Sequence, residues 1–167
     1  AIIQLAETLS NLHAKKISHR DIKPSNIYFY NDAYCLGDFG LVSFPDNPND
    51  FTRSDRGLGA IFTIAPEMKR DPKHADGRKA DVYSLAKTMW ILITGNKKCF
   101  DGVYNFKDKS HGLRYIDKFK DIHIVELEEL LQTSTSNDPY ERPSINEFKM
   151  ALENYLSILD DFTASQK

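Results

Sequence analysis

The sequence has few cysteines, no long apolar run and little net charge. Its two cysteines, Cys35 and Cys99, stand far apart and form no CxxC pair, so neither a zinc site nor a disulfide framework is predicted. A reducing, cytoplasmic compartment fits this pattern best. The apolar run over residues 89–93 is far shorter than the ~20 residues of a membrane span. A formal net charge of −2 gives no reason to expect nucleic acid or an anionic membrane as a partner.

Apolar residues recur at helical spacing over several segments of the chain. A length of 167 residues with 41% hydrophobic residues suits one domain with one core. The segment 79–94 is apolar on nearly every side, which predicts a helix through the core that ends at Gly95. Ser144 and Glu147 form a capping box at the start of the last predicted helix. Predicted helices therefore cover residues 1–16, 79–94, 122–133 and 144–159, and the polar residues 160–167 are expected to fray.

Two other stretches lack helical periodicity. From Ile27 to Leu36, two short runs rich in aromatic and β-branched residues flank Asn31 and Asp32, which predicts a small β-hairpin. Residues 41–60 are rich in Pro, Gly, Ser, Thr, Asn and Asp, and they predict a long loop. A loop of this length inside a domain is usually functional or disordered.

The most specific patterns are HRDIKPSN at residues 19–26 and DFG at residues 38–40, separated by the predicted hairpin. Together they resemble the catalytic loop and the metal-binding motif of the protein kinase family. The resemblance implies a mainly α fold, a protein-kinase-like C-terminal lobe with a small β-hairpin. That lobe would occupy residues 1–167, with an activation segment at 38–67 and a last helix ending at about residue 159.

The resemblance also implies a role for each residue of these motifs. Asp21 would be a solvent-facing carboxylate that orients a substrate hydroxyl and takes its proton. Lys23 would place an ammonium group against the γ-phosphate of ATP. Asn26 and Asp38 would offer oxygen ligands to Mg²⁺, and Tyr28, where leucine is usual, would form one wall for the adenine. The implied cofactors are therefore ATP and Mg²⁺, and the implied partner is a protein substrate.

Other matches to the family imply structural roles. His19 would pack near Phe39, and Asp81 would hold the backbone of the catalytic loop. Glu67, in Ala-Pro-Glu at the end of the activation segment, would pair with Arg142. The remaining histidines have no ligand spacing, so no functional role is predicted for His13, His74, His111 or His123.

Lys23-Pro24-Ser25 resembles the serine/threonine kinases rather than the tyrosine kinases. Ala60 departs from the pattern, because serine/threonine members usually have a threonine there. Arg20, directly before Asp21, resembles kinases that are switched on by phosphorylation of the activation segment. A phosphate on Thr52 or Ser54 would pair with Arg20 and order the loop, although both are equally explained as plain loop residues.

Nothing in the sequence resembles the Gly-rich loop or the lysine-bearing strand of the family's N-terminal lobe. The chain begins without methionine, and we expect it to be a fragment that is inactive alone. The face that would meet the missing N-terminal lobe, with Tyr28, Phe29 and Phe39, would be exposed and open to self-association. A non-catalytic, pseudokinase-like binding or scaffold module is the alternative, but the intact set of Asp21, Lys23, Asn26 and Asp38 favours an enzyme.

Overall fold

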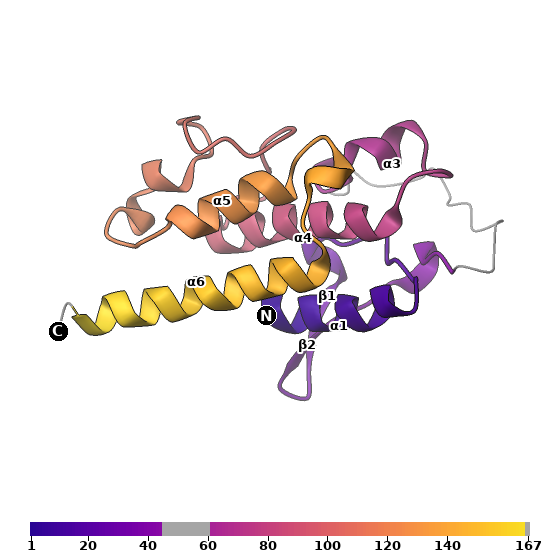
Figure 1. The fold of residues 1–167 in the computed structure, drawn as a ribbon, viewed down its shortest axis with the longest axis horizontal. Coiled ribbons are helices and arrows are strands. Elements are labelled where there is room, and N and C mark those ends of the chain that lie inside the picture. The colour runs from indigo at the N-terminus through magenta and orange to yellow at the C-terminus, as the bar shows by residue number, and fades with distance from the viewer. Residues whose placement is uncertain (45–60, 166–167) are drawn as a thin grey trace.

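In the computed structural model, which describes residues 1–44 and 61–165, helices surround a central helix and one small hairpin projects from them (Figure 1). The mainly α fold that the sequence predicts is confirmed. Short 3₁₀ turns lie between the regular elements, among them Pro24–Asn26 and Phe39–Leu41. The regular elements are α1 (Ile2–Ala14), β1 (Ile27–Tyr30), β2 (Ala33–Leu36), α3 (Pro66–Arg70), α4 (Gly77–Thr94), α5 (Val125–Ser134) and α6 (Ile145–Ser165).

Helix α4 forms the centre of the core, as the sequence predicts. Its residues from 80 to 91 are all buried, and α1, α5 and α6 pack against it. Figure 1 shows α4 between α5 and α1, with α6 running beside α1. The apolar stripes of the outer helices meet this helix through side chains that include Leu5, Leu9, Leu131, Phe148 and Leu152. In the described ranges, no helix has the length and apolar character that a membrane span needs.

The predicted hairpin is confirmed, because β1 pairs antiparallel with β2. Asn31 and Asp32 connect the strands with positive φ angles of 48° and 59°, which suits a tight two-residue hairpin turn. The hairpin rests on α1, where the backbone N–H of Tyr34 donates to Oε1 of Gln4 at 3.2 Å. A two-stranded hairpin is marginal alone, so this contact with α1 helps to fix it.

The helix ends follow the predictions in part. Gly95 ends α4 with φ of 74°, and Ser144 and Glu147 form the predicted capping box through reciprocal bonds of 3.3 and 2.7 Å. The prediction that the last helix ends at about residue 159 is wrong, because α6 continues through Ser165. The ring of Phe162 packs against His123 with centroids 5.9 Å apart, which stabilises the polar last turns.

A largely buried ion pair joins α3 to the segment that precedes α6. The guanidinium group of Arg142 donates to both carboxylate oxygens of Glu67 at 2.6 and 2.8 Å, as predicted. Its N–H groups also donate to the carbonyls of Ser136 and Lys79, and its Cζ lies 4.8 Å from the ring centre of Tyr83. The Arg142 side chain is fully buried and that of Glu67 is 16% exposed. Removing one partner would leave a charge in the core without compensation.

We therefore expect Arg142→Ala to lower the free energy of unfolding by about 3–5 kcal/mol, since it leaves Glu67 unpaired. Arg78→Ala is the matched control, because Arg78 is an exposed arginine that pairs with Asp76. Arg78→Ala should lower the free energy of unfolding by less than about 1 kcal/mol. Urea denaturation of both variants measures the two effects. Equal midpoints for Arg142→Ala and the parent would contradict the anchoring role.

Lys87 is a second buried charge, and it has no carboxylate within hydrogen-bonding distance in the described ranges. Its Nζ donates to the backbone carbonyl of Phe100 at 2.6 Å and lies 3.6 Å from the centre of the Phe100 ring. One turn earlier on α4, the hydroxyl of Tyr83 donates to the carbonyl of Gly102 at 3.2 Å. The two side chains thus hold the segment that follows α4. Burial lowers the pKa of Lys87 to about 8 from its ordinary value of 10.5.

The lowered pKa of Lys87 predicts that the free energy of unfolding rises with pH above about 8. Lys87→Met should remove this pH dependence. Below pH 8 the folded state carries the full cost of the buried ammonium group, and the cost falls as the pH rises from about 8 to 10.5. The parent should therefore gain stability relative to Lys87→Met across that range. Denaturation of both proteins at several pH values gives the difference directly. A difference independent of pH would contradict the prediction.

Candidate active site

Three of the predicted site residues meet in one cluster between α1 and β1. Nζ of Lys23 lies 2.8 Å from Oδ2 of Asp21. Nδ2 of Asn26 donates to the same oxygen at 3.0 Å and to the carbonyl of Asp21 at 2.8 Å. The expectation that Asp21 faces solvent is wrong, since only 7% of the residue is exposed. The two donors explain how an acidic side chain is tolerated at this depth.

The hydrogen bonds of this cluster leave specific oxygens available. Both side-chain donors to Asp21 fall on Oδ2, so Oδ1 accepts no hydrogen bond from the described residues. Asn26 directs its amide N–H₂ group to Asp21, which leaves its own Oδ1 as a free acceptor. The cluster thus offers one carboxylate oxygen that can accept a proton and one amide oxygen that can bind a cation.

Asp38 lies at the same end of the hairpin as Asn26. Asn26 directly precedes β1, and its carbonyl accepts a hydrogen bond of 2.9 Å from the N–H of Gly37, the residue before Asp38. Asp38 is exposed and has a left-handed backbone with φ of 59°. Its only bond to the described residues is a long one, 3.4 Å, from the N–H of Gly40 to Oδ1. Its carboxylate therefore remains largely uncommitted.

The donor chemistry of Asn26 and Asp38 fits Mg²⁺, a hard cation that binds oxygen and commonly takes one or two protein ligands together with substrate phosphates. No group of three or more His, Cys, Asp or Glu side chains gathers as a metal site in residues 1–44 and 61–165. The available oxygens therefore suit a cation that arrives with a phosphate ligand better than one held by protein alone.

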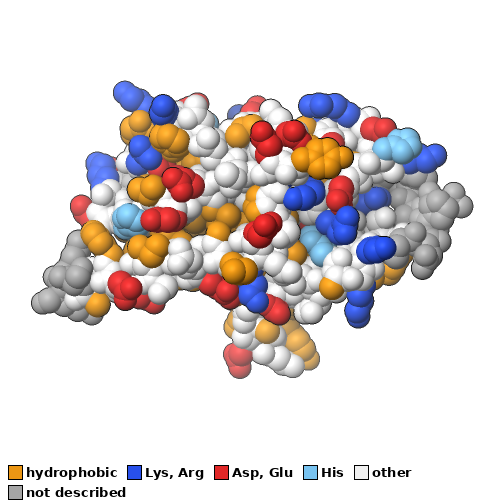
Figure 2. Space-filling model, viewed as in Figure 1, with side chains coloured by type: hydrophobic (Ala, Val, Ile, Leu, Met, Phe, Trp, Pro, Cys, Tyr) orange, Lys and Arg blue, Asp and Glu red, His pale blue; other side chains and the backbone are white. Residues whose placement is uncertain are grey.

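Aromatic side chains cover the hairpin beside this cluster. Figure 2 shows orange side chains gathered on the hairpin at the bottom of the view. The expected exposure of Tyr28, Phe29 and Phe39 is confirmed, at 53%, 61% and 52%. The ring of Tyr28 lies directly over Gly37, where an added Cβ would be only 2.5 Å from Cε2 of the tyrosine. Gly37 thus makes room for a flat ring beside the residue that precedes Asp38.

The predicted contact between His19 and Phe39 is also confirmed, as their rings meet edge to face with centroids 5.0 Å apart. His19 is fully buried, and its Nδ1 lies 3.4 Å from the N–H of Asp21. This contact ties the segment that carries Asp38 to the segment that carries Asp21.

The Asp81 carboxylate holds the backbone next to Asp21, as predicted. Its two oxygens accept the N–H groups of His19 and Arg20, both at 2.8 Å. Arg20 has a φ of 65°, a conformation that costs about 1–3 kcal/mol in a non-glycine residue. Gly77 lets the start of α4 lie close to Ser18, because an added Cβ at residue 77 would be 2.2 Å from Oγ of Ser18. Asp81 thus stabilises a strained backbone immediately before Asp21.

No functional role is predicted for His13 from the sequence, yet its Nε2 lies 2.9 Å from Oδ2 of Asp81. The available signal was helical spacing, since His13 follows the buried Leu9 by four residues and therefore shares its face of α1. Thr52 and Ser54, considered equally as phosphorylation sites and as plain loop residues, lie outside the described residues, as does Ala60, which departs from the family pattern.

Comparisons with known proteins find relatives whose names describe protein kinases. The chain is 32% identical over 159 residues to protein R436 of Acanthamoeba polyphaga mimivirus, whose name describes a serine/threonine-protein kinase; the match covers 95% of this chain and 57% of that protein. It is 32% identical over 144 residues to the Wee1-like protein kinase of Arabidopsis thaliana, covering 86% and 27%. It is 36% identical over 95 residues to CBL-interacting protein kinase 4 of Oryza sativa subsp. japonica, covering 56% and 21%.

The chain thus spans little more than half of R436 and about a quarter or less of the other two relatives. A sequence model of the protein kinase domain matches residues 1–153. That match includes the Asp21 cluster, the hairpin and the anchor between Glu67 and Arg142, and on this evidence the chain belongs to the protein kinase family.

Proposed function

We propose that this chain is the catalytic-loop-bearing lobe of a serine/threonine protein kinase, which transfers the γ-phosphate of ATP to a protein hydroxyl once an N-terminal lobe completes the site. The observation that carries the proposal is the cluster of Asp21, Lys23 and Asn26, with Asp38 at the same end of the hairpin. The serine/threonine assignment rests on Lys23-Pro24-Ser25 and on relatives whose names describe serine/threonine kinases.

In this proposal Asp21 acts on the substrate hydroxyl. Oδ2 is fixed by Lys23 and Asn26, so Oδ1 is the oxygen that would orient the hydroxyl and accept its proton. Phosphoryl transfer depends mainly on positioning and on neutralising the charge of the transferred group. Lys23, whose side chain is 20% exposed, would supply a positive charge beside that group while it also holds Asp21.

The oxygens of Asn26 and Asp38 would hold Mg²⁺, which neutralises phosphate charge when it is bound with ATP. Tyr28, fixed over Gly37, would present its exposed ring to the adenine. The remaining exposed aromatic surface of the hairpin would face the N-terminal lobe, or a second copy of this chain where that lobe is absent. This reading is supported by the exposure of Tyr28, Phe29 and Phe39.

The first test is Asp21→Asn in the full-length protein that carries this chain. The asparagine keeps one oxygen for the donors but removes the proton acceptor, so turnover should fall by about 10² or more. The control is Asp117→Asn, which alters an exposed aspartate paired with Lys120 and should leave turnover unchanged. Initial rates with a protein acceptor, followed by identification of the phosphorylated residue type, give the answer. Near-normal turnover would contradict the role of Asp21, and label on tyrosine alone would contradict the serine/threonine assignment.

The second test is Asp38→Asn in the same protein. The amide oxygen can still accept from Gly40, so folding should be unaffected, but the loss of a charged ligand should weaken ATP binding in the presence of Mg²⁺ by about tenfold. Calorimetric titrations with Mg²⁺ and with EDTA separate the metal-dependent part. The 167-residue chain alone should bind more weakly than the full-length parent. Equal affinity of Asp38→Asn and the parent with Mg²⁺ would contradict the assignment.

A further inference from the structure

The segment that follows α4 carries an excess of positive charge. Residues 97–120 contain seven Lys and Arg and three Asp, a net charge of +4, although the whole chain carries −2. All seven basic residues are exposed. Figure 2 shows blue side chains among orange ones at the upper left, where Figure 1 draws the loops between α4 and α5. A local excess of this kind attracts a negatively charged partner.

Three of these basic residues are engaged within the protein. Arg114 pairs with Glu128 at 2.6 Å, and Lys120 pairs with Asp117 at the same distance. Lys118 donates to a backbone carbonyl at the end of α4. In the described ranges, four lysines form no ion pair and are available to a partner: Lys97, Lys98, Lys107 and Lys109.

The aspartates of this segment do not neutralise the four lysines. Asp117 is paired with Lys120. Oδ1 of Asp108 accepts the N–H and the hydroxyl of Ser110 at 2.8 and 2.7 Å, and these bonds lower the pKa of the Asp108 carboxyl. Asp101 is exposed and makes no hydrogen bond or ion pair with the described residues. Four available ammonium groups therefore stand against one available carboxylate.

A cavity of about 510 Å³ lies beside these lysines. Lys98 lines it, and so does Asp108, the residue between Lys107 and Lys109. The volume lies in the range of about 300–1,000 Å³ that ligand pockets have. One side chain of a bound peptide can therefore enter the cavity while the lysines contact its neighbours. Much of the lining is aromatic: Phe62, Trp90, Phe100 and His111.

Buried side chains hold this surface in place. Nε1 of Trp90 donates to the carbonyl of His111 at 3.0 Å, and the His111 ring stacks on Phe100 with centroids 5.0 Å apart. The hydroxyl of Tyr104 donates to Oε1 of the buried Glu128 at 2.8 Å. A surface that is fixed before binding loses little conformational entropy when a partner arrives.

We propose that the four lysines and the aromatic cavity form a docking surface for an acidic segment of the protein substrate. This segment would carry Asp and Glu residues around one apolar side chain, with the carboxylates against the lysines and the apolar side chain in the cavity. Trp90 and Phe100 are buried rather than exposed as platforms on which bases could stack, which favours a peptide over single-stranded nucleic acid. The inference names a class of substrate, so it rests on the proposed kinase function.

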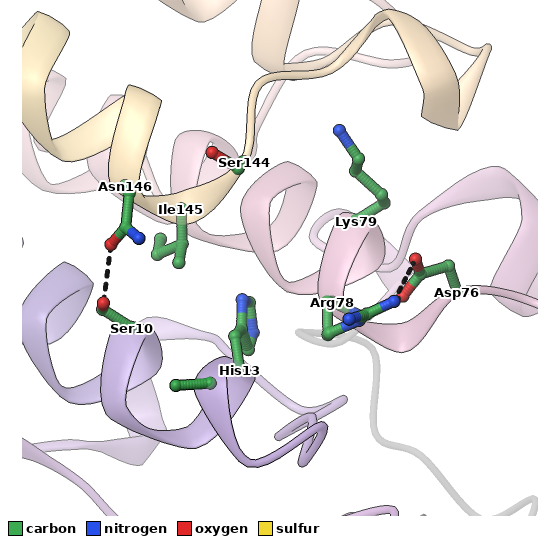
Figure 3. A pocket seen from close by; sticks show the side chains of 9 residues that line it. Ser10, His13, Asp76, Arg78, Lys79, Ser144, Ile145 and Asn146 are labelled. Carbon is green, nitrogen blue, oxygen red and sulfur yellow. Dashed lines mark hydrogen bonds and ion pairs between the residues drawn. The ribbon is translucent and has the colours of Figure 1, made fainter.

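Lys15 and Lys16 provide a matched control. Both are exposed, and neither side chain forms an ion pair with the described residues. Figure 3 shows His13, two residues before Lys15, beside the start of α4. Lys97 and Lys98 follow the other end of α4, whose 18 residues span about 27 Å. Replacing Lys15 and Lys16 therefore removes the same charge as replacing one lysine pair of the docking surface, but at the opposite end of the helix.

The experiment uses the full-length protein that carries this chain and a fluorescent peptide in which Asp and Glu flank one Phe. The peptide contains no Ser, Thr or Tyr, so anisotropy measures binding without phosphate transfer. Replacing all four lysines of the docking surface by Gln should weaken binding about tenfold or more, and replacing either adjacent pair should weaken it about threefold. Lys15→Gln with Lys16→Gln should leave binding unchanged. Binding to the parent should weaken at high salt.

Two altered peptides test the two parts of the surface. A peptide with Asn and Gln in place of Asp and Glu should bind the parent and the four-lysine variant equally weakly, because no carboxylate remains to meet the lysines. A peptide with Gly in place of Phe should bind the parent more weakly than the original, because the cavity stays empty.

The second measurement uses the acidic peptide with a serine added. The four-lysine variant should raise KM for this peptide about tenfold and keep kcat within about twofold, because the lysines bind the substrate equally in the ground state and the transition state. KM for ATP should not change.

The inference fails if the parent binds the neutral peptide as tightly as the acidic one, or if the folded four-lysine variant binds the acidic peptide like the parent. It also fails if the control pair shows the same loss. Should the four-lysine variant not fold, the two double variants decide by the same criteria. Binding of an oligonucleotide or of a second copy of the chain through these lysines, without binding of the acidic peptide, overturns the inference as well.

The two measurements separate this inference from the proposed function. If the acidic peptide binds through the lysines but the parent phosphorylates no peptide, the docking surface stands and the proposed function is rejected. If the parent phosphorylates a neutral peptide and does not bind the acidic one, the proposed function stands and the docking surface is rejected.

Discussion

The backbone around Asp21 depends on the hydrogen bonds that the buried carboxylate of Asp81 accepts. Asp81 lies near the start of α4, the most buried helix of the described chain, and it accepts hydrogen bonds from His13, His19 and Arg20. The charge is tolerated because these donors replace the water that it loses. A rigid helix in the core is thereby connected to a backbone segment that would not adopt its left-handed turn unaided.

The same helix is tied at other points to segments that carry little regular structure. Arg142 reaches the carbonyl of Lys79 while it pairs with Glu67, so the short helix α3 is anchored next to the start of α4. Lys87, farther along, holds the carbonyl of Phe100. Arg142 contacts α4 and fixes α3, whereas Lys87 lies on α4 and fixes the segment that follows it. Helix α4 thus fixes the positions of segments that are distant from one another in the sequence.

The sequence predicts a contact correctly where both of its residues belong to recognised family motifs. Asp81 with the catalytic loop, Glu67 with Arg142, and His19 with Phe39 follow from the family resemblance, and local signals located the hairpin and the cap at Gly95. The predictions from sequence are wrong where the burial of a side chain or the end of a helix depends on residues that are distant in the sequence. The burial of Asp21 depends on donors folded around it, and the last turns of α6 depend on the contact of Phe162 with His123. The link between His13 and Asp81 joins two helices, so spacing along one helix could indicate only that His13 faces inward.

Burial separates the charged groups that hold the structure from those available for chemistry. Asp81, Arg142 and Lys87 are almost completely enclosed, and their bonding groups are directed at fixed partners. Asp38 is exposed and nearly uncommitted, so its charge remains available to a cation. Asp21 lies between these extremes, because one oxygen is fixed by Lys23 and Asn26 while the other accepts nothing from the described chain. A carboxylate held by one oxygen and free at the other can be both accurately placed and reactive, which is the combination that proton transfer from a hydroxyl requires.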